Sequence, residues 1–181
     1  KGNINTDDFH GWATKKFTDK RGFIVVSNEG SGDVTPQTVQ AKIDQHKPDI
    51  VICDYHQLFT DNRKSSSIVE RNRNISSEFK QMAIRNNIPI IDITAATMDD
   101  VSDQDNPPML SQVAWSKAIE YDADMAFAVH KTQGTNIIEV VSRKNRHGQE
   151  FDFYLDWDIN RGVISPIYEN LPEMKNDSSK N

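Results

Sequence analysis

The feature that most constrains the fold is a short run of consecutive apolar residues that stops at an acidic one. Residues 50–53 read Ile-Val-Ile-Cys, and Asp54 follows directly. Such a run is typical of a strand covered on both faces, as in the sheet of an α/β protein. An ionised carboxylate at its end is costly to bury unless a cation or hydrogen-bond donors face it. We therefore expect Asp54 either to order Mg²⁺ beside bound phosphates or to cap the following turn.

Further strand-like runs recur along the chain and alternate with helical patterns. Strands that alternate with helices predict crossover connections, a mostly parallel sheet and an α/β fold. The last two runs are close in sequence, which favours an antiparallel hairpin at the edge of the sheet. The expected strands are residues 23–26, 50–53, 88–94, 125–129, 137–141 and 151–155.

Two helices are indicated clearly between these runs, and a third weakly. Thr35 and Pro36 match the cap and first position of a helix that begins there. A weaker helical pattern covers residues 108–124. In the segment 66–87, four apolar residues recur on one helical face. They are Ile68, Ile75, Phe79 and Met82.

Composition limits the classes of protein that remain. The net charge of −6 excludes a surface coated in basic residues for nucleic acid, but not a local basic site. The single cysteine, Cys53, cannot form an internal disulfide, which suits a reducing cytoplasmic setting. No apolar stretch approaches the roughly 18 residues that span a membrane. We expect one soluble domain over residues 1–170 and a disordered polar tail over 171–181.

A basic cluster stands out in this acidic chain at residues 143–148. Lys144 and Arg146 are two residues apart, so on an extended strand they project from the same face. Two cations on one face make a good phosphate clamp, with the arginine bidentate and the lysine as a point charge. The alternative is a solvated hairpin tip. Two long connections, residues 60–66 and 96–108, follow the carboxyl ends of strands, where open α/β sheets bind ligands.

Several common catalytic motifs are absent from the sequence. The glycine-bearing stretch at residues 28–34 lacks the lysine of a G-x-x-x-x-G-K-[ST] phosphate loop. No G-x-S-x-G motif occurs, and the five histidines have no metal-ligand spacing. A small-molecule α/β enzyme is disfavoured because no catalytic base or nucleophile is recognisable.

Taken together, the order and spacing of these segments resemble the C-terminal RecA-like ATPase domain of DnaB-type replicative helicases, in a divergent, phage-like form. The resemblance covers residues 6–157 and implies a RecA-like P-loop NTPase core whose N-terminal part is missing. Its most specific motifs are DYHQLF, AIEYDAD and KNRHG. The other matching segments are TDDFHGW, FIVVSNEGSGDVTPQTVQAKI, IPIIDITAAT and IIEVVSRKNRHGQ.

The resemblance implies a role for each matching position. Asp54 would be the Walker B aspartate that orders Mg²⁺ through water, with Thr94 at the nucleotide on the next strand. Lys144 and Arg146 would reach the γ-phosphate of the ATP held by a neighbouring subunit. The two long connections would meet single-stranded DNA. The residues expected at the DNA are Arg63, Lys64, Ser116 and Lys117.

The family also implies cofactors and partners. ATP and Mg²⁺ are expected in the complete domain, and identical subunits are expected in a hexameric ring. Primase or a helicase loader are further expected partners, and no membrane is expected.

The sequence departs from the family at defined positions. The phosphate loop and catalytic glutamate have no counterpart in the sequence, so we expect no ATP hydrolysis by this chain alone. Ala95 stands where the family has a glutamine that senses the γ-phosphate. Four aspartates in residues 99–105 would repel DNA phosphates. The departures leave two hypotheses: the C-terminal part of a helicase, or a non-catalytic RecA-like module that supplies an arginine finger to a partner.

Overall fold

The computed structural model describes residues 11, 22–27, 33–63, 65–96, 106–112 and 116–167. The chain forms two compact units, Lys1–Asp33 and Val34–Asn181. In the first unit, residues 22–27 are neither helix nor strand, so the strand predicted at residues 23–26 is wrong. Val25 and Val26 stay exposed there, and the apolar run gains none of the burial that stabilises a strand. The predicted tail, residues 171–181, lies outside the described residues.

Helix α2, Pro36–His46, begins where its sequence predicts. Thr35 is the N-cap, and its side chain accepts a hydrogen bond from the backbone of Thr38. The Thr38 hydroxyl lies 3.0 Å from the Thr35 backbone nitrogen and accepts its hydrogen bond, which closes a capping box. Pro36 stands at the first turn, where its missing N–H is not needed. Residues that are close in sequence thus determine this helix start.

Helix α3, Ile68–Asn86, is the longest described element. Ser67 caps its start by accepting from Glu70, and Asn87 ends it in the left-handed conformation. Of the predicted apolar face, Ile75, Phe79 and Met82 are buried, whereas Ile68 at the first position is 47% exposed. The amphipathic prediction therefore holds beyond the first turn.

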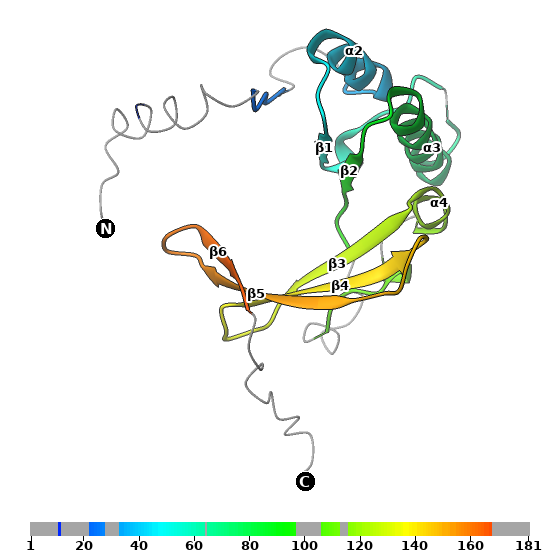
Figure 1. Cartoon of the computed structure of the whole chain (residues 1–181). Coiled ribbons are helices and arrows are strands. Elements are labelled where there is room, and N and C mark those ends of the chain that lie inside the picture. The colour runs from blue at the N-terminus through cyan, green and yellow to red at the C-terminus, as the bar shows by residue number, and fades with distance from the viewer. Residues whose placement is uncertain are drawn as a thin grey trace. The chain divides into compact units, whose positions relative to one another are not determined.

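Strands β1, Val51–Asp54, and β2, Ile90–Ile93, form a two-stranded parallel sheet. Their register aligns Val51 with Ile90 and Asp54 with Ile93. Between them the chain passes through a short 3-10 helix, η1, His56–Leu58, and then α3. Helices α2 and α3 lie on the same side of this sheet (Figure 1).

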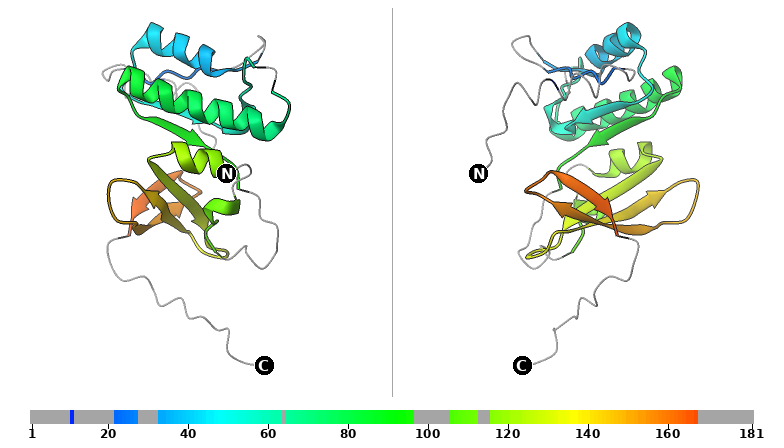
Figure 2. Two further views of the ribbon diagram at one scale, coloured as in Figure 1. Left: turned by 90° about the vertical axis from the view of Figure 1, so that its right-hand side faces the viewer. Right: turned by 60° about the vertical axis from the view of Figure 1, so that its left-hand side comes forward.

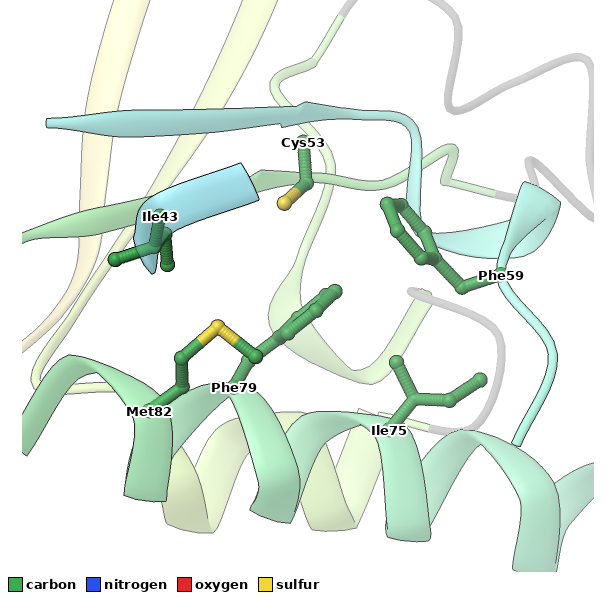
Figure 3. Close-up of a cluster of buried hydrophobic side chains, with 6 residues drawn as sticks. All are labelled: Ile43, Cys53, Phe59, Ile75, Phe79 and Met82. Atoms are coloured by element: carbon green, nitrogen blue, oxygen red, sulfur yellow. The ribbon is translucent and has the colours of Figure 1, made fainter. Parts of the chain in front are cut away.

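The core of the second unit lies between this parallel sheet and its two helices (Figure 3). The rings of Phe59 and Phe79 meet edge to face, with centroids 5.1 Å apart. None of the described elements covers the opposite face of β1, where Ile52 is 55% exposed, so the expectation of burial on both faces is wrong. The reason is that both helices pack on one face. The core side chains are Ile43, Cys53, Phe59, Ile75, Phe79 and Met82.

The remaining strands form a separate antiparallel sheet in the order β3-β4-β5-β6. The predicted hairpin corresponds to β4 and β5, which pair antiparallel, and β3 also pairs antiparallel with β4. The fold is therefore α/β as predicted, with an antiparallel part that extends beyond a single hairpin. The strands are β3, Met125–Lys131; β4, Ile137–Asn145; β5, Asp152–Asp158; and β6, Val163–Pro166.

Two short helices precede this sheet: η3, Leu110–Gln112, and α4, Ser116–Asp122. Figure 2 shows α4 between α3 and the antiparallel sheet. The Ser76 hydroxyl of α3 donates to Asp122 of α4 over 2.8 Å. In the described part of the chain, no helix is both long and apolar enough to cross a membrane.

Candidate functional site

Asp54 ends β1 with its carboxylate exposed to solvent. Cys53, its neighbour in sequence, points into the core, so the pleat of the strand turns Asp54 to the opposite face. Within the described residues, the Asp54 carboxylate makes no hydrogen bond or ion pair, and η1 has no side-chain cap. The capping alternative therefore has no support in the structure.

An exposed carboxylate without a protein partner suits Mg²⁺. This ion keeps several waters and needs only one or two carboxylates besides the phosphates it binds. No group of three or more histidine, cysteine, aspartate or glutamate residues that could hold a metal occurs among the described residues. Asp54 could supply one carboxylate to Mg²⁺, and waters and phosphate oxygens would complete the coordination.

Thr94 follows the carboxyl end of β2, beside the end of β1. Gln57 of η1 donates its amide to the Thr94 hydroxyl over 3.0 Å and to the Ala95 carbonyl over 3.4 Å. The structure thus brings Asp54 and Thr94 to adjacent strand ends, as the sequence predicts. The structure also places Gln57 at these strand ends. The sequence alone does not single out this residue, although it lies within the DYHQLF motif.

A buried polar pair lies just behind this strand end. His56 is fully buried, and its Nδ1 lies 2.6 Å from Oδ2 of Asp92 on β2. Burial, together with the nearby Asp92 carboxylate, raises the pKa of Cys53 to about 12, so its thiol stays protonated and unreactive. The sequence alone does not predict this pair. The feature that could have indicated it is Asp92, an aspartate inside an otherwise apolar strand. The pair links η1 to β2.

The two basic candidates, Lys144 and Arg146, lie at the end of β4 and both bond to α4. Lys144 donates its Nζ to the Glu120 carbonyl. Arg146 donates Nη2 to the Tyr121 carbonyl over 2.7 Å. Both cations therefore reach the same helix end, as their shared strand face predicts. Both side chains are hydrogen-bonded to α4, whereas the alternative interpretation expected a hairpin tip surrounded by solvent.

Asp124 lies where α4 gives way to β3 and joins three parts of the chain. Its Oδ1 is 3.6 Å from Nη1 of Arg146, and its Oδ2 is 2.5 Å from Nζ of Lys80 on α3. The hydrogen bond from Lys80 holds the pKa of Asp124 below its usual range, and the nearby arginine lowers it further. The carboxylate is thus ionised at neutral pH.

The candidate DNA-binding residues lie on different elements. Arg63, whose side chain is 64% exposed, contacts Asn74 over 3.4 Å and Glu78 over 3.5 Å, both on α3. Lys117 is exposed on α4. Ser116 begins the same helix, and nothing is described of its side chain. Lys64 lies outside the described residues.

The connection that carries Arg63 is pinned to α3 by a polar network. Asp61 accepts from the Ser65 hydroxyl over 2.5 Å and from the Asn74 amide over 2.8 Å. Although burial opposes it, these hydrogen bonds hold the pKa of Asp61 below its usual range. A cavity of about 410 Å³ opens beside this connection. Its lining is Thr60, Asp61, Arg63, Ser65, Ser66, Ser67, Ile68 and Arg71.

A family model described as the DnaB-like helicase C-terminal domain matches residues 1–161. A probable plasmid replicative DNA helicase of Chlamydia trachomatis is 31% identical over 128 residues, which are 68% of this chain and 27% of that protein. The replicative DNA helicase DnaC of Bacillus subtilis is 28% identical over 168 residues, which are 82% of this chain and 37% of that protein. The chain thus spans about a quarter to just over a third of these relatives.

Solved structures show the same fold. One solved ATPase domain matches with a TM-score of 0.68 at 25% identity, over 75% of this chain and 52% of that chain. A DnaB-like replicative helicase, solved in a study of its interactions with primase, matches with a TM-score of 0.77 at 22% identity. That match covers 91% of this chain and 42% of the other. The RecA-like α/β fold is therefore shared.

Proposed function

The chain belongs to the DnaB-like helicase C-terminal domain family, and from this premise we propose that it works within an ATP-driven helicase that translocates on single-stranded DNA as a hexameric ring. One observation carries the proposal. The chain presents a carboxylate without a protein partner among the described residues, Asp54, at the end of one strand, and a pair of cations, Lys144 and Arg146, at the end of another. These are the two charges that a phosphoryl-transfer site needs.

Asp54 serves the nucleotide bound by its own domain. Its carboxylate would hold Mg²⁺ through water, and Thr94, on the adjacent strand end, would face the phosphates. When bound, Mg²⁺ neutralises charge that develops on the β- and γ-phosphate oxygens. The contribution of this chain is to position the carboxylate, because the buried core behind β1 holds the strand end that carries Asp54.

Lys144 and Arg146 serve the nucleotide of a neighbouring subunit. The guanidinium offers a planar fork to phosphate oxygens, and the ammonium adds a point charge. In a ring, each subunit would then complete the site of the next, so that hydrolysis depends on assembly.

The DNA contact is proposed for Arg63, Lys64, Ser116 and Lys117. The support is the exposure of Arg63 and Lys117 and the pinning of the Arg63 connection to α3 through Asp61 and Asn74. A pinned, exposed cation loses little side-chain freedom when it meets a phosphate. Primase and a helicase loader are proposed partners, the former because a structural relative was solved for its interactions with primase.

A second candidate function is a non-catalytic module that supplies Arg146 to a partner helicase. It is favoured by Ala95, which stands in place of the glutamine that senses the γ-phosphate. In that case Asp54 would have no role in hydrolysis.

The test uses the native assembly that contains this chain. We expect Arg146→Ala to lower hydrolysis by about a thousandfold or more while nucleotide binding persists, because an arginine finger acts on the transition state. Arg161→Ala removes an exposed cation from the turn before β6 and should leave the rate unchanged. Hydrolysis near the unmutated rate in Arg146→Ala would refute the finger assignment.

Asp54→Asn separates the two candidate functions. We expect it to remove Mg²⁺-dependent hydrolysis if the chain is part of a helicase. If the chain is a module, Asp54→Asn leaves hydrolysis unchanged and only Arg146→Ala lowers it.

A further inference from the structure

We propose that Asp124 is the positioning residue for Arg146, and that Lys80 fixes this carboxylate to α3. The inference rests on the proposed role of Arg146 as a finger and extends it to residues that the sequence motifs do not identify. Asp124 itself does not reach the nucleotide; it acts only through the guanidinium that it holds.

The first support is that Asp124 contacts both ends of Arg146. The backbone N–H of Arg146 donates to the Asp124 carbonyl over 2.9 Å, which continues the β3–β4 ladder by one step. The side chains then meet, with Nη1 of Arg146 3.6 Å from Oδ1 of Asp124. One residue thus limits both where the arginine leaves the strand and where its head lies.

The second support is that the two carboxylate oxygens of Asp124 contact different cations. Oδ1 faces Arg146, whereas Oδ2 lies 2.5 Å from Nζ of Lys80. Lys80 is the less exposed partner, at 23% of its side chain against 46% for Asp124. The lysine therefore holds the carboxylate, and the carboxylate is left to orient the arginine. Because both groups are charged, the hydrogen bond between them is of the stronger kind.

The third support is that Lys80 belongs to the helix that backs β1. Its neighbour Phe79 lies in the core between α3 and the strand that ends in Asp54. Helix α3 thus positions both charged groups. It positions Asp54 through buried apolar packing, and Arg146 through the bridge formed by Lys80 and Asp124. A displacement of α3 would move both together.

Asp122 provides a matched comparison on the same helix end. Its carboxylate also bonds to α3, by accepting from the Ser76 hydroxyl over 2.8 Å. Within the described part of the chain its carboxylate makes no hydrogen bond or ion pair with Arg146. Asp122→Asn and Asp124→Asn therefore make the same chemical change two residues apart, and only the second removes the charge that faces the guanidinium.

The experiment measures steady-state hydrolysis and nucleotide affinity in the native assembly. We expect Asp124→Asn to lower kcat on the order of ten- to a hundredfold with KM unchanged, because a misplaced finger weakens only the transition state. Asp122→Asn should stay within about twofold of the unmutated rate. Asp124→Glu, which keeps the charge on a longer side chain, should restore part of the loss.

A double-mutant cycle distinguishes positioning from a merely structural role. If Asp124 acts through Arg146, then Asp124→Asn has no further effect on kcat once Arg146→Ala is present. A further loss in that background, or an unchanged kcat in Asp124→Asn alone, would overturn the inference. If Asp124→Asn fails to assemble, Lys80→Met tests the same bridge and should also lower kcat with KM unchanged; an unaltered kcat there refutes the bridge.

The outcomes also separate this inference from the proposed function. Loss of hydrolysis in Arg146→Ala with no effect of Asp124→Asn retains the finger and rejects the positioning residue. Full hydrolysis in Arg146→Ala rejects both.

Discussion

The ends of β1 and β4 carry opposite charges and are held in place by opposite means. The Asp54 carboxylate makes no hydrogen bond or ion pair among the described residues, and its strand is backed by a buried cluster that includes Phe79. Arg146 is exposed and is held by polar contacts to Tyr121 and Asp124. The carboxylate is thus positioned by packing, and the guanidinium by hydrogen bonds and charge.

This difference predicts which substitutions should change stability and which should change activity. Packing behind a strand contributes several kcal/mol and cannot be altered without cost to folding. Exposed polar contacts contribute little to stability but determine geometry. We therefore expect changes behind Asp54 to destabilise the fold, and changes beside Arg146 to alter activity while the fold persists.

The largest expected effect is on the reactivity of Cys53, the residue before Asp54. Its pKa of about 12, against 9.0 for an ordinary thiol, lowers the thiolate fraction about a thousandfold near pH 8. Alkylation by iodoacetamide should therefore be slowed to that degree, and the same reaction in urea provides the unfolded reference. Since the folded pKa is raised, stability should also fall as pH rises from 9 towards 12. Rapid alkylation without denaturant would show that burial does not hold this strand end.

The next largest effect concerns the core behind β1. Phe79→Ala should lower the free energy of unfolding by about 3–5 kcal/mol, because it removes a buried ring and leaves a cavity. Urea denaturation followed by circular dichroism measures this. Ile84→Ala, on the same helix but 60% exposed, is the control and should cost about 1 kcal/mol or less. If Phe79→Ala and Ile84→Ala lowered the free energy of unfolding equally, packing behind β1 would not be what positions Asp54.

A smaller effect is expected at the buried pair of His56 and Asp92. His56→Leu introduces an apolar side chain of similar size and leaves the Asp92 carboxylate without its partner. The expected loss is about 1–3 kcal/mol of unfolding free energy. His46→Leu, at the exposed end of α2, serves as the control. If His56→Leu is neutral in the same urea experiment, then packing alone positions η1.

At the two strand ends, the smallest effect on stability is expected at Asp124. Because Asp124 is 46% exposed, Asp124→Asn should cost about 1 kcal/mol or less. The pKa of Asp124 is lowered in the folded state, so its contribution is present at neutral pH and is lost as pH falls below the ordinary value of 3.8. Melting temperatures of the unmutated protein and Asp124→Asn should converge there. A loss of several kcal/mol at neutral pH would mean that the charged contacts of Asp124 stabilise the fold as strongly as the packing behind β1 does.

Features encoded by neighbouring residues could be predicted from the sequence. The start of α2 depends on Thr35, Pro36 and Thr38, which lie within four positions of one another. The strand that ends at Asp54 follows from a run of consecutive apolar residues, and the buried face of α3 follows from helical periodicity. The run at residues 23–26 has equally strong β propensity and still forms no strand, because propensity does not supply a partner.

The contacts that position the candidate site could not be predicted, since they join residues far apart in the chain. Gln57 meets Thr94 across 37 positions, and Lys80 meets Asp124 across 44. No local pattern distinguishes these pairs from other polar residues on the surface. The motif with Lys144 and Arg146 predicted the cations and their shared face, but not the α4 carbonyls that hold them.

The uncovered face of the parallel sheet has a consequence for how mutational data on this chain should be read. Ile52, Ile91 and Ile93 are 55%, 47% and 43% exposed, so replacing one by threonine should change the stability of the chain by only about 0.5 kcal/mol. A stability screen would score these positions as tolerant of polar residues. A screen for assembled, active protein would score them as intolerant wherever another surface covers that face. The disagreement between the two screens, residue by residue, would map the interface without a structure of the complex.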